Sequence, residues 1–244
     1  MVAKGLYSSN HLNTRIDVSA TMSTKNDFKQ QLFGQFARVA KALSHANRLE
    51  LLEFLAQSER SVEELANVAA LSVANTSQHL QQLRQAGLVT SRKQGQKVYY
   101  QLSGDDVVGL FESLRHVAGR HLAEVNQLVG NYLYIKDSLE PLPREELLQR
   151  VRDDLVTVID VRPAIEYAAG HLPGAINIPI AELEQHLAEL DPAQEIVAYC
   201  RGPHCVLAFD AVARLREKGL KARRLEDGYP EWKSAGLPVE QSTE

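Results

Sequence analysis

The sequence of 244 residues predicts two domains of different class, a mainly helical N-terminal domain and a C-terminal α/β domain. In the first half, apolar residues recur at helical spacing, and a single stretch of alternating residues predicts a β-hairpin. In the second half, short apolar runs alternate with amphipathic segments, an order typical of a parallel sheet covered by helices. Pro141 and Pro143 mark the boundary between them. The predicted segments are a polar extension over 1–26, ordered or disordered, a domain over 27–135, a linker over 136–147 and a domain over 148–240.

The N-terminal domain is expected to contain several helices before its hairpin. Apolar spacing predicts helical structure over 28–55, interrupted at 44–47. Ser61 and Glu64 have the spacing of a capping box and predict a helix to Ala69. A turn at 71–72 leads into a helix over 73–86, which Gly87 ends. A hairpin over 88–102 turns around 94–95, and a long helix is predicted over 105–134.

Two short helices, a tight turn and a basic hairpin give the order of a winged helix-turn-helix, whose second helix enters the major groove of DNA. Asn and Gln side chains can pair with adenine, and Thr and Val can contact the thymine methyl group. The positions of this helix predicted to be exposed and to read bases are Val73, Asn75, Thr76, Gln78, His79 and Gln82. Those predicted to face the core are Ala74, Ser77, Leu80 and Leu83. The hairpin residues predicted to contact phosphates or the minor groove are Arg92, Lys93, Gln96 and Lys97.

Residues 36–128 resemble the ArsR family of bacterial repressors. The motifs that carry the resemblance are ALSHANRL at 42–49, Leu71-Ser72, TSQHLQQLRQAGLV at 76–89, Gly95, and VYY at 98–100. The resemblance implies a homodimer, paired through the first and last helices, that binds a near-palindromic double-stranded operator.

A metal-sensing role is a weaker alternative for this domain. The cysteine pair of metal-sensing ArsR proteins would fall near Ser61 and Glu63, where there is no thiol. His121 and Glu124 fit only half of the last-helix site of that family, whereas zinc needs about four ligands. We therefore expect no metal and no dissociable cofactor.

The only two cysteines of the chain lie in one loop, Cys200-Arg201-Gly202-Pro203-His204-Cys205. The loop follows an apolar run predicted to be a strand and precedes an amphipathic helix that begins at Val206. Backbone N–H groups at the start of a helix favour an anion, so a thiol held there loses its proton more readily and becomes a nucleophile. Two incidental buried thiols or a structural disulfide are the alternatives.

Residues 145–240 resemble a rhodanese domain through four motifs in order: VIDVR at 158–162, EYAAGHLPGAINIP at 166–179, the cysteine loop, and LEDGYPEW at 225–232. The resemblance implies that Cys200 accepts sulfur as a persulfide, stabilised by the N–H groups of residues 201–206. Arg201 would attract an anionic donor such as thiosulfate or a polysulfide, and His204 would tune the thiol. Asp160 and Arg162 either hold the loop or belong to the scaffold.

Cys205 has two alternative roles. It resolves a persulfide on Cys200 by forming a disulfide or a polysulfide bridge, or it packs under the helix as an inert thiol. A direct bond between the two cysteines requires Cα atoms within about 7 Å.

Charge and composition complete the prediction. Residues 28–104 hold nine basic and five acidic residues, whereas residues 144–244 hold twelve basic and eighteen acidic residues, so the first half suits a polyanion better. With two cysteines and no apolar run of about 20 residues, we expect a cytoplasmic protein without membrane association and with thiols reduced at rest.

The sequence therefore predicts a homodimeric DNA-binding regulator whose C-terminal domain senses reactive sulfur or redox state. The first alternative is a thiosulfate-type sulfurtransferase that uses the winged helix for dimerisation or docking. The second is a metal- or ligand-sensing regulator with a passive C-terminal half.

Overall fold

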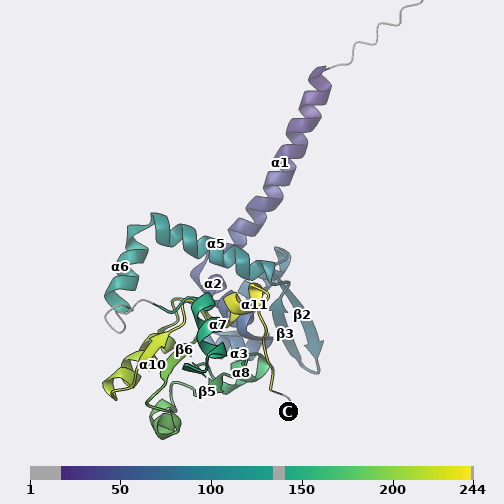
Figure 1. Ribbon diagram of the computed structural model, residues 1–244. Coiled ribbons are helices and arrows are strands. Elements are labelled where there is room, and N and C mark those ends of the chain that lie inside the picture. The colour runs from purple at the N-terminus through teal and green to yellow at the C-terminus, as the bar shows by residue number, and fades with distance from the viewer. Residues whose placement is uncertain (1–17, 134–140, 243–244) are drawn as a thin grey trace, which may run out of the picture. The chain divides into compact units, whose positions relative to one another are not determined.

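The computed structural model describes residues 18–133 and 141–242 (Figure 1). Residues from Ala42 onward form one compact unit, and a separate unit ends at Lys41. The separate unit contains most of helix α1 (Val18–Leu43). This helix begins inside the segment predicted to be a polar extension. Residues 1–17 of that segment lie outside the described residues.

The winged helix-turn-helix is formed by the elements that the sequence predicted, together with one short strand that it did not. In chain order they are α2 (Ala46–Gln57), β1 (Arg60–Ser61), α3 (Val62–Val68), α4 (Val73–Gln85), β2 (Val89–Gln94) and β3 (Lys97–Leu102). The three strands form an antiparallel sheet in the order β1-β3-β2. Buried leucines from α2, α3 and α4 form the core of the winged helix-turn-helix, among them Leu51, Leu65 and Leu80.

The capping box predicted at the start of α3 is confirmed. The Ser61 hydroxyl accepts the Glu64 N–H at 3.2 Å, and the Glu64 carboxylate accepts the Ser61 N–H at 2.8 Å. In the hairpin, Gln94 pairs with Lys97, so the two turn residues are Gly95 and Gln96, one position later than predicted. Gly95 has a φ of 62°, a conformation that a two-residue hairpin turn requires and that glycine adopts at low cost.

The long helix predicted over 105–134 is two helices, α5 (Asp106–His121) and α6 (Ala123–Tyr132). Leu122 has extended backbone angles and separates them. Because the break removes the N–H that would bond the Gly119 carbonyl, the Asn126 side-chain amide donates to that carbonyl instead at 3.0 Å. Helical spacing continues across the break, so the sequence pattern does not reveal it.

The C-terminal half contains the predicted parallel sheet, in the strand order β5-β4-β6-β7. Its elements are α7 (Arg144–Arg152), β4 (Val156–Asp160), α8 (Ala164–Ala169), β5 (Ile176–Asn177), α9 (Leu183–His186), the 3-10 helix η1 (Leu187–Glu189), β6 (Glu195–Tyr199), α10 (Val206–Glu217), β7 (Ala222–Arg224) and α11 (Tyr229–Ser234). Helix α7, the first of these elements, begins inside the linker predicted over 136–147. Leu142 already belongs to this fold, because it is fully buried and its N–H donates to the Arg224 carbonyl at 2.8 Å.

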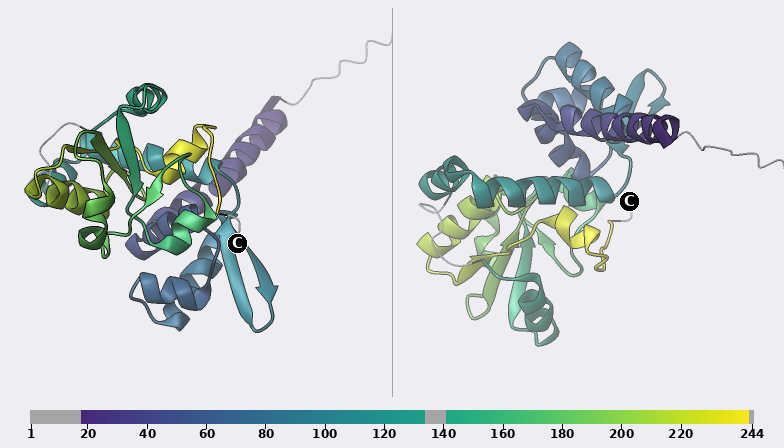
Figure 2. Two further views of the ribbon diagram at one scale, coloured as in Figure 1. Left: turned by 60° about the horizontal axis from the view of Figure 1, so that its bottom comes forward. Right: turned by 90° about the horizontal axis from the view of Figure 1, so that it is seen from above.

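Helices cover both faces of the sheet, and its two central strands, β4 and β6, are largely apolar (Figure 2). Ile196, Ala198 and Cys200 pack in the cluster formed with α9 and α10. Val197 and Tyr199 pack on the opposite face, in the cluster formed with α7 and α11. The alternation places Cys200 at the end of β6 and on the α10 side of the sheet.

Candidate functional site

The loop between β6 and α10 brings the two cysteines together. Cys200 directly follows β6, and Cys205 is the N-cap residue of α10. A turn in which the Cys205 N–H donates to the Gly202 carbonyl at 3.1 Å places their Cα atoms 6.2 Å apart. This separation lies within the range of a disulfide, and the two residues form one. The structure therefore holds the oxidised pair, whereas reduced thiols were expected from the sequence.

The two sulfur-bearing residues differ in their surroundings. Cys200 is 1% exposed and packs among the apolar side chains of the α10 cluster, whereas Cys205 is partly exposed. No hydrogen bond reaches either sulfur within the part of the chain that the structure describes. An uncharged disulfide requires none. Stabilisation of an anionic thiolate or persulfide by the N–H groups of residues 201–206 thus stays a prediction. The start of α10 has no side-chain cap, so its N–H groups are open to such an anion.

Two residues at the start of α11 support the back of the loop. The Tyr229 N–H donates to the Cys200 carbonyl at 3.0 Å. A Cβ at Gly228 would lie 2.3 Å from the Gly202 nitrogen and 2.4 Å from the Arg201 carbonyl carbon. Only glycine allows this approach of the two backbones, which explains the glycine of the LEDGYPEW motif.

Arg201, predicted to attract an anionic donor, already has a carboxylate partner. Its Nε and Nη2 donate to the two oxygens of Glu166 at 2.9 and 2.7 Å. The Glu166 side chain is fully buried on α8, and the Arg201 side chain is 17% exposed. A bidentate pair of this kind orients the arginine, so its first role in this state is to fix the loop.

Glu166 also binds an arginine from the winged helix. Nη2 of Arg60, in β1, lies 2.7 Å from Glu166 Oε1, and the Arg60 side chain is 5% exposed. One buried carboxylate is therefore shared by two arginines, Arg60 and Arg201. Burial lowers the pKa of Arg60, and the charge of Glu166 opposes that effect. Glu166 lies within the EYAAGHLPGAINIP motif but was not predicted to belong to the site, and no sequence signal marked Arg60.

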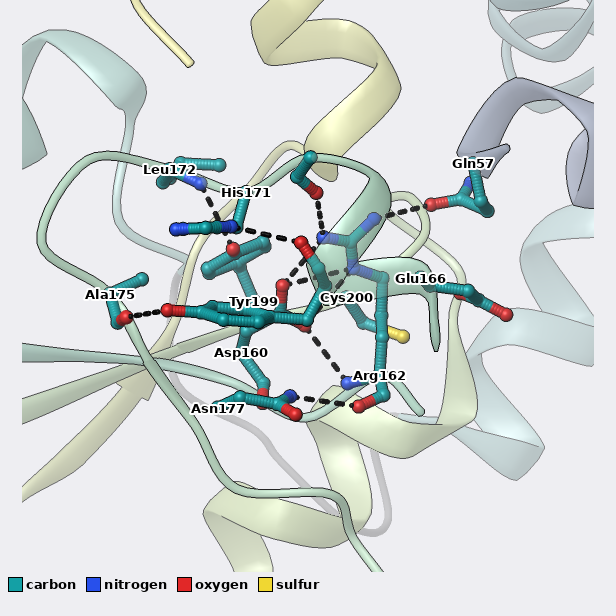
Figure 3. Close-up of polar contacts among 12 residues, drawn as sticks. Gln57, Asp160, Arg162, Glu166, His171, Leu172, Ala175, Asn177, Tyr199 and Cys200 are labelled. Atoms are coloured by element: carbon teal, nitrogen blue, oxygen red, sulfur yellow. Dashed lines mark hydrogen bonds and ion pairs between the residues drawn. The ribbon is translucent and has the colours of Figure 1, made fainter. Parts of the chain in front are cut away.

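A second buried contact joins the two halves beside the loop (Figure 3). Arg162 and Asp160 form a fully buried ion pair at 2.6 Å. Nη1 of Arg162 donates to Oε1 of Gln57 at 3.0 Å, and Nε2 of Gln57 donates to the Arg201 carbonyl at 3.4 Å. Asp160 and Arg162 therefore contact the loop through Gln57, the last residue of α2, which could not be identified from the sequence.

A groove of about 630 Å³ borders the outer side of the loop. Pro203 and His204 line it, and His204 is exposed there. The other lining residues come from α5, α6, α7 and the α11 region and are mostly charged: Glu112, Arg115, His116, Gly119, Arg120, Asn126, Arg144, Asp227 and Glu231. Arg115 pairs with Glu231, and Arg144 pairs with Asp227. The groove thus has both acidic and basic side chains and is not a purely cationic path for an anionic sulfur donor.

The recognition helix α4 presents part of the predicted base-reading face. Val73, Gln78 and Gln82 are exposed and Asn75 is partly exposed. The predicted exposure of Thr76 and His79 is wrong, since these residues are 0% and 7% exposed.

The face of α4 that packs on the core consists of Thr76, His79, Leu80 and Leu83. The Thr76 hydroxyl donates to the Ser72 carbonyl at 3.0 Å. Ala74, predicted to face the core, is exposed, and Ser77 is partly exposed. Helical spacing placed Leu80 and Leu83 correctly, but polarity alone misplaced the edges of the buried stripe.

The wing presents to solvent all four residues predicted to contact phosphates or the minor groove. Arg92, Lys93, Gln96 and Lys97 are all exposed. Arg92 also pairs with Glu59 and lies 4.9 Å from the Tyr99 ring centroid, so the wing is fixed to the loop that precedes β1.

Metal binding and membrane insertion would each require a local feature among residues 18–133 and 141–242. No group of three or more His, Cys, Asp or Glu in these segments is arranged to hold a metal ion. No helix among them has the length and apolar character needed to span a bilayer.

Comparison with known proteins agrees with this division into halves. Residues 45–91 match the model of the bacterial regulatory protein arsR family, and residues 143–235 match that of the rhodanese-like domain. The chain is 46% identical over 220 residues to the HTH-type transcriptional regulator Rv0324 of Mycobacterium tuberculosis, which covers 90% of this chain and 96% of that protein.

Each half also has relatives of its own. A sulfurtransferase of Allochromatium vinosum is 30% identical over 97 residues, which are 39% of this chain and 89% of that protein. The solution structure of the homodimeric winged helix-turn-helix DNA-binding domain Mb0332 from Mycobacterium bovis is 42% identical, with a TM-score of 0.37, and covers 38% of this chain and 87% of that one. The chain thus belongs to the arsR family of bacterial transcriptional regulators and carries a rhodanese-like domain behind its winged helix-turn-helix.

Proposed function

We propose that this regulator binds double-stranded operator DNA as a cytoplasmic homodimer and that sulfur chemistry at Cys200 controls its DNA affinity. Cys200 accepts sulfur from a small donor such as thiosulfate or a polysulfide, and Cys205 resolves the product. The observation that carries the proposal is the pairing of the two cysteines across one loop at the start of α10, with Cα atoms 6.2 Å apart.

The chemistry is a pair of sulfur substitutions. The Cys200 thiolate attacks the outer sulfur of thiosulfate, the S–S bond of the donor breaks, and sulfite leaves, so that Cys200 carries a persulfide. The Cys205 thiol then attacks the Cys200 sulfur as a thiolate, and hydrosulfide leaves. The product is the disulfide form. The donor is reduced to sulfite plus hydrosulfide, and the two thiols supply the two electrons.

Exposed side chains in the winged helix support the DNA-binding part. Gln78 and Gln82 on α4 suit adenine edges, and the wing lysines Lys93 and Lys97 suit phosphates. The dimer is supported by apolar side chains left exposed on the helices that the family resemblance assigns to pairing. On α1 these are Phe28, Phe33 and Phe36, and on α5 and α6 they are Leu110, Leu114, Val117, Leu128 and Tyr132.

A sulfurtransferase enzyme is the alternative that shares Cys200. The 1% exposure of Cys200 and its bond to Cys205 favour a sensor over an enzyme, because turnover requires donor and acceptor to reach the same sulfur repeatedly. A cyanide-dependent thiocyanate assay with rapid turnover, combined with no retention of selected DNA, would support the enzyme instead.

The experiment that tests the proposal measures DNA affinity as a function of cysteine state. A duplex of about 30 base pairs, roughly three helical turns, is selected by the protein from a random library, and its affinity is measured at fixed salt. The dithiol form, the disulfide form and protein treated with inorganic polysulfide are compared, and intact mass reports each added sulfur. We expect Cys200→Ser to abolish the response and Cys205→Ser to arrest it at the persulfide. Equal affinity of all forms of the wild-type protein would overturn the sensing function.

A further inference from the structure

Helix α2 connects the sulfur loop to the recognition helix. It has twelve residues and is therefore about 18 Å long. Its C-terminal end contacts the rhodanese-like half and its N-terminal end contacts α4. The leucines between these ends, among them Leu51, Leu52 and Leu55, are buried in the core, so the helix is held as a rigid element.

At the C-terminal end, two side chains of α2 contact the loop directly. The Gln57 amide accepts from Arg162 at 3.0 Å and donates to the Arg201 carbonyl at 3.4 Å. The Arg201 guanidinium lies 4.9 Å from the centroid of the Phe54 ring. Gln57 is 3% exposed, so its amide has no water to replace these partners if the loop moves away.

A second route leads from the loop to the wing. Arg201 and Arg60 share the Glu166 carboxylate, and Arg60 is paired with Tyr100 of β3, a strand of the wing. The Arg60 Nε is buried without a hydrogen-bond partner in the described structure. Two buried or partly buried arginines thus share one carboxylate, a costly arrangement in which loss of the Glu166 carboxylate would leave both guanidinium charges uncompensated. Such a contact favours two discrete arrangements over continuous deformation.

At the N-terminal end, α2 reaches the recognition helix. Nη1 of Arg48 donates to Oε1 of Gln82 at 2.7 Å, and Gln82 is one of the exposed residues predicted to contact bases. The His45 ring, at the N-cap of α2, lies 4.5 Å from the His79 ring of α4 between centroids. A shift of α2 along or about its axis therefore changes the position of the base-reading face.

We propose that Gln57 and Arg60 of the winged helix sense the state of the Cys200–Cys205 loop and that α2 and β1 transmit it to the recognition helix and the wing. The inference rests on the proposed function and names its coupling element. Opening the disulfide releases the constraint on residues 200–205. Arg201 then moves relative to Gln57 and Glu166. Coupling of this kind is reciprocal, so bound DNA must also change the reduction potential of the cysteine pair.

The test measures the coupling in both directions in the full chain. The first measurement is the ratio of DNA affinities of the dithiol and disulfide forms, with the library-selected duplex as probe. The second is the equilibrium between these forms with dithiothreitol and its cyclic disulfide, with and without that duplex. If the affinity ratio is tenfold for each cysteine pair, the potential must shift by about 30 mV when DNA binds.

The variants are Gln57→Met and Arg60→Met, which keep side-chain length and lose the polar contacts. We expect each to reduce the affinity ratio at least threefold and to reduce the shift in potential in parallel, while disulfide formation without DNA remains intact. Matched controls lie in the rhodanese-like half away from the loop. Gln194→Met removes a contact with Thr157, and Arg150→Met removes pairs with Glu146 and Glu195. Both are expected to keep the wild-type ratio.

The outcomes separate this inference from the proposed function. If the wild-type protein shows no affinity difference between its forms, the sensing function fails. If it shows one and both methionine variants retain it, the proposed route through α2 and β1 is wrong. Should Arg60→Met fail to fold, Arg60→Lys retains a charge opposite Glu166 but cannot reproduce the guanidinium geometry. A wild-type ratio in a folded Arg60→Lys protein would likewise overturn the part assigned to Arg60.

Discussion

Gly228 and Gly202 lie with their backbones in contact, because a Cβ at position 228 would be 2.3 Å from the Gly202 nitrogen. Gly228 precedes α11, whose first N–H holds the Cys200 carbonyl. The spacing of the two cysteines therefore depends on a contact from a segment more than twenty residues away in the chain.

Gly228→Ala is expected to displace the sulfur loop. The added methyl group meets backbone atoms of residues 201 and 202, which cannot rotate away as a side chain can. We expect a loss of about 2–4 kcal/mol of unfolding free energy, in the range of severe overpacking, and slower formation of the Cys200–Cys205 disulfide. Urea denaturation and thiol titration measure both effects. Gly130→Ala in α6 is the control, because its Cβ meets nothing within 4 Å and a helical alanine is neutral or stabilising.

Glu231→Gln is expected to destabilise the protein and loosen α11. The carboxylate pairs with Arg115 and accepts the Gly228 N–H at 3.0 Å, and the Glu231 side chain is only 6% exposed. Removing one charge from a buried pair costs about 3–5 kcal/mol when the remaining charge stays uncompensated, and less where, as for Arg115, it is partly exposed. Lys233→Met, which breaks an exposed pair with Asp105, should cost less than about 1 kcal/mol. Equal losses in the two variants would contradict the structure.

Gln78→Ala and Thr76→Val should separate DNA contact from helix stability. Gln78 is exposed on α4, so its replacement should lower the affinity for the selected duplex about tenfold and leave the unfolding free energy nearly unchanged. Thr76 is fully buried, so its replacement should act mainly on stability. Anisotropy titrations and thermal unfolding measure the two effects. The reverse pattern would show that the other face of α4 contacts DNA.

Wing substitutions are expected to change the salt dependence of binding. Lys93→Ala and Lys97→Ala should each reduce the slope of log affinity against log salt by about 1, with similar losses on specific and non-specific DNA. Lys218→Ala in the C-terminal half is the control, since it removes a lysine that pairs with Glu184 and lies outside the winged helix. An unchanged slope in both wing variants would exclude the wing from phosphate contact.

The pH dependence of stability is expected to contain a contribution from His79. Burial lowers its pKa below the ordinary value of 6.5, and the nearby His45 and Arg48 lower it further. As the pH falls below about 6.5, the unfolded chain binds a proton at this position before the folded protein does. The free energy of unfolding therefore falls from pH 7.5 toward pH 5.5.

His79→Phe keeps an aromatic ring against His45 and removes the titrating group. We expect its unfolding free energy to fall less over the same pH range, measured by urea denaturation at each pH. The other histidines and carboxyls are common to both proteins, so the difference between the two curves isolates His79. Parallel curves would show that His79 is not the responsible group.

Much of the fold could be predicted because local signals agree with it. The capping box at Ser61, the glycine turn of the wing and the apolar strands of the sheet each specify their own structure. The break at Leu122 could not be predicted, because helical spacing continues across it and the Gly119 carbonyl accepts from the Asn126 side chain instead of a backbone N–H. The two-residue strands β1 and β5 exist only through their pairing with distant strands.

The candidate site could be predicted only in part for a similar reason. The cysteine loop is a contiguous motif, and its spacing is visible in the sequence. Gln57, Arg60 and Glu166 become neighbours of that loop only after the two halves pack together. The exposure predicted for Thr76 failed because its hydroxyl finds a partner within the helix, the Ser72 carbonyl. His79 is buried against the His45 ring although its Nδ1 has no hydrogen-bond partner in the described structure, so polarity did not predict its position.

Trp232, the only tryptophan of the chain, occupies α11 one residue after Glu231. Its ring is 3% exposed and its Nε1 donates to the Pro238 carbonyl at 2.8 Å. An indole in such surroundings emits at shorter wavelength than a hydrated one. The native protein therefore carries its single tryptophan in the helix that supports the sulfur loop, and a red shift of the tryptophan emission on adding polysulfide would report loosening of α11 in real time, without any dye.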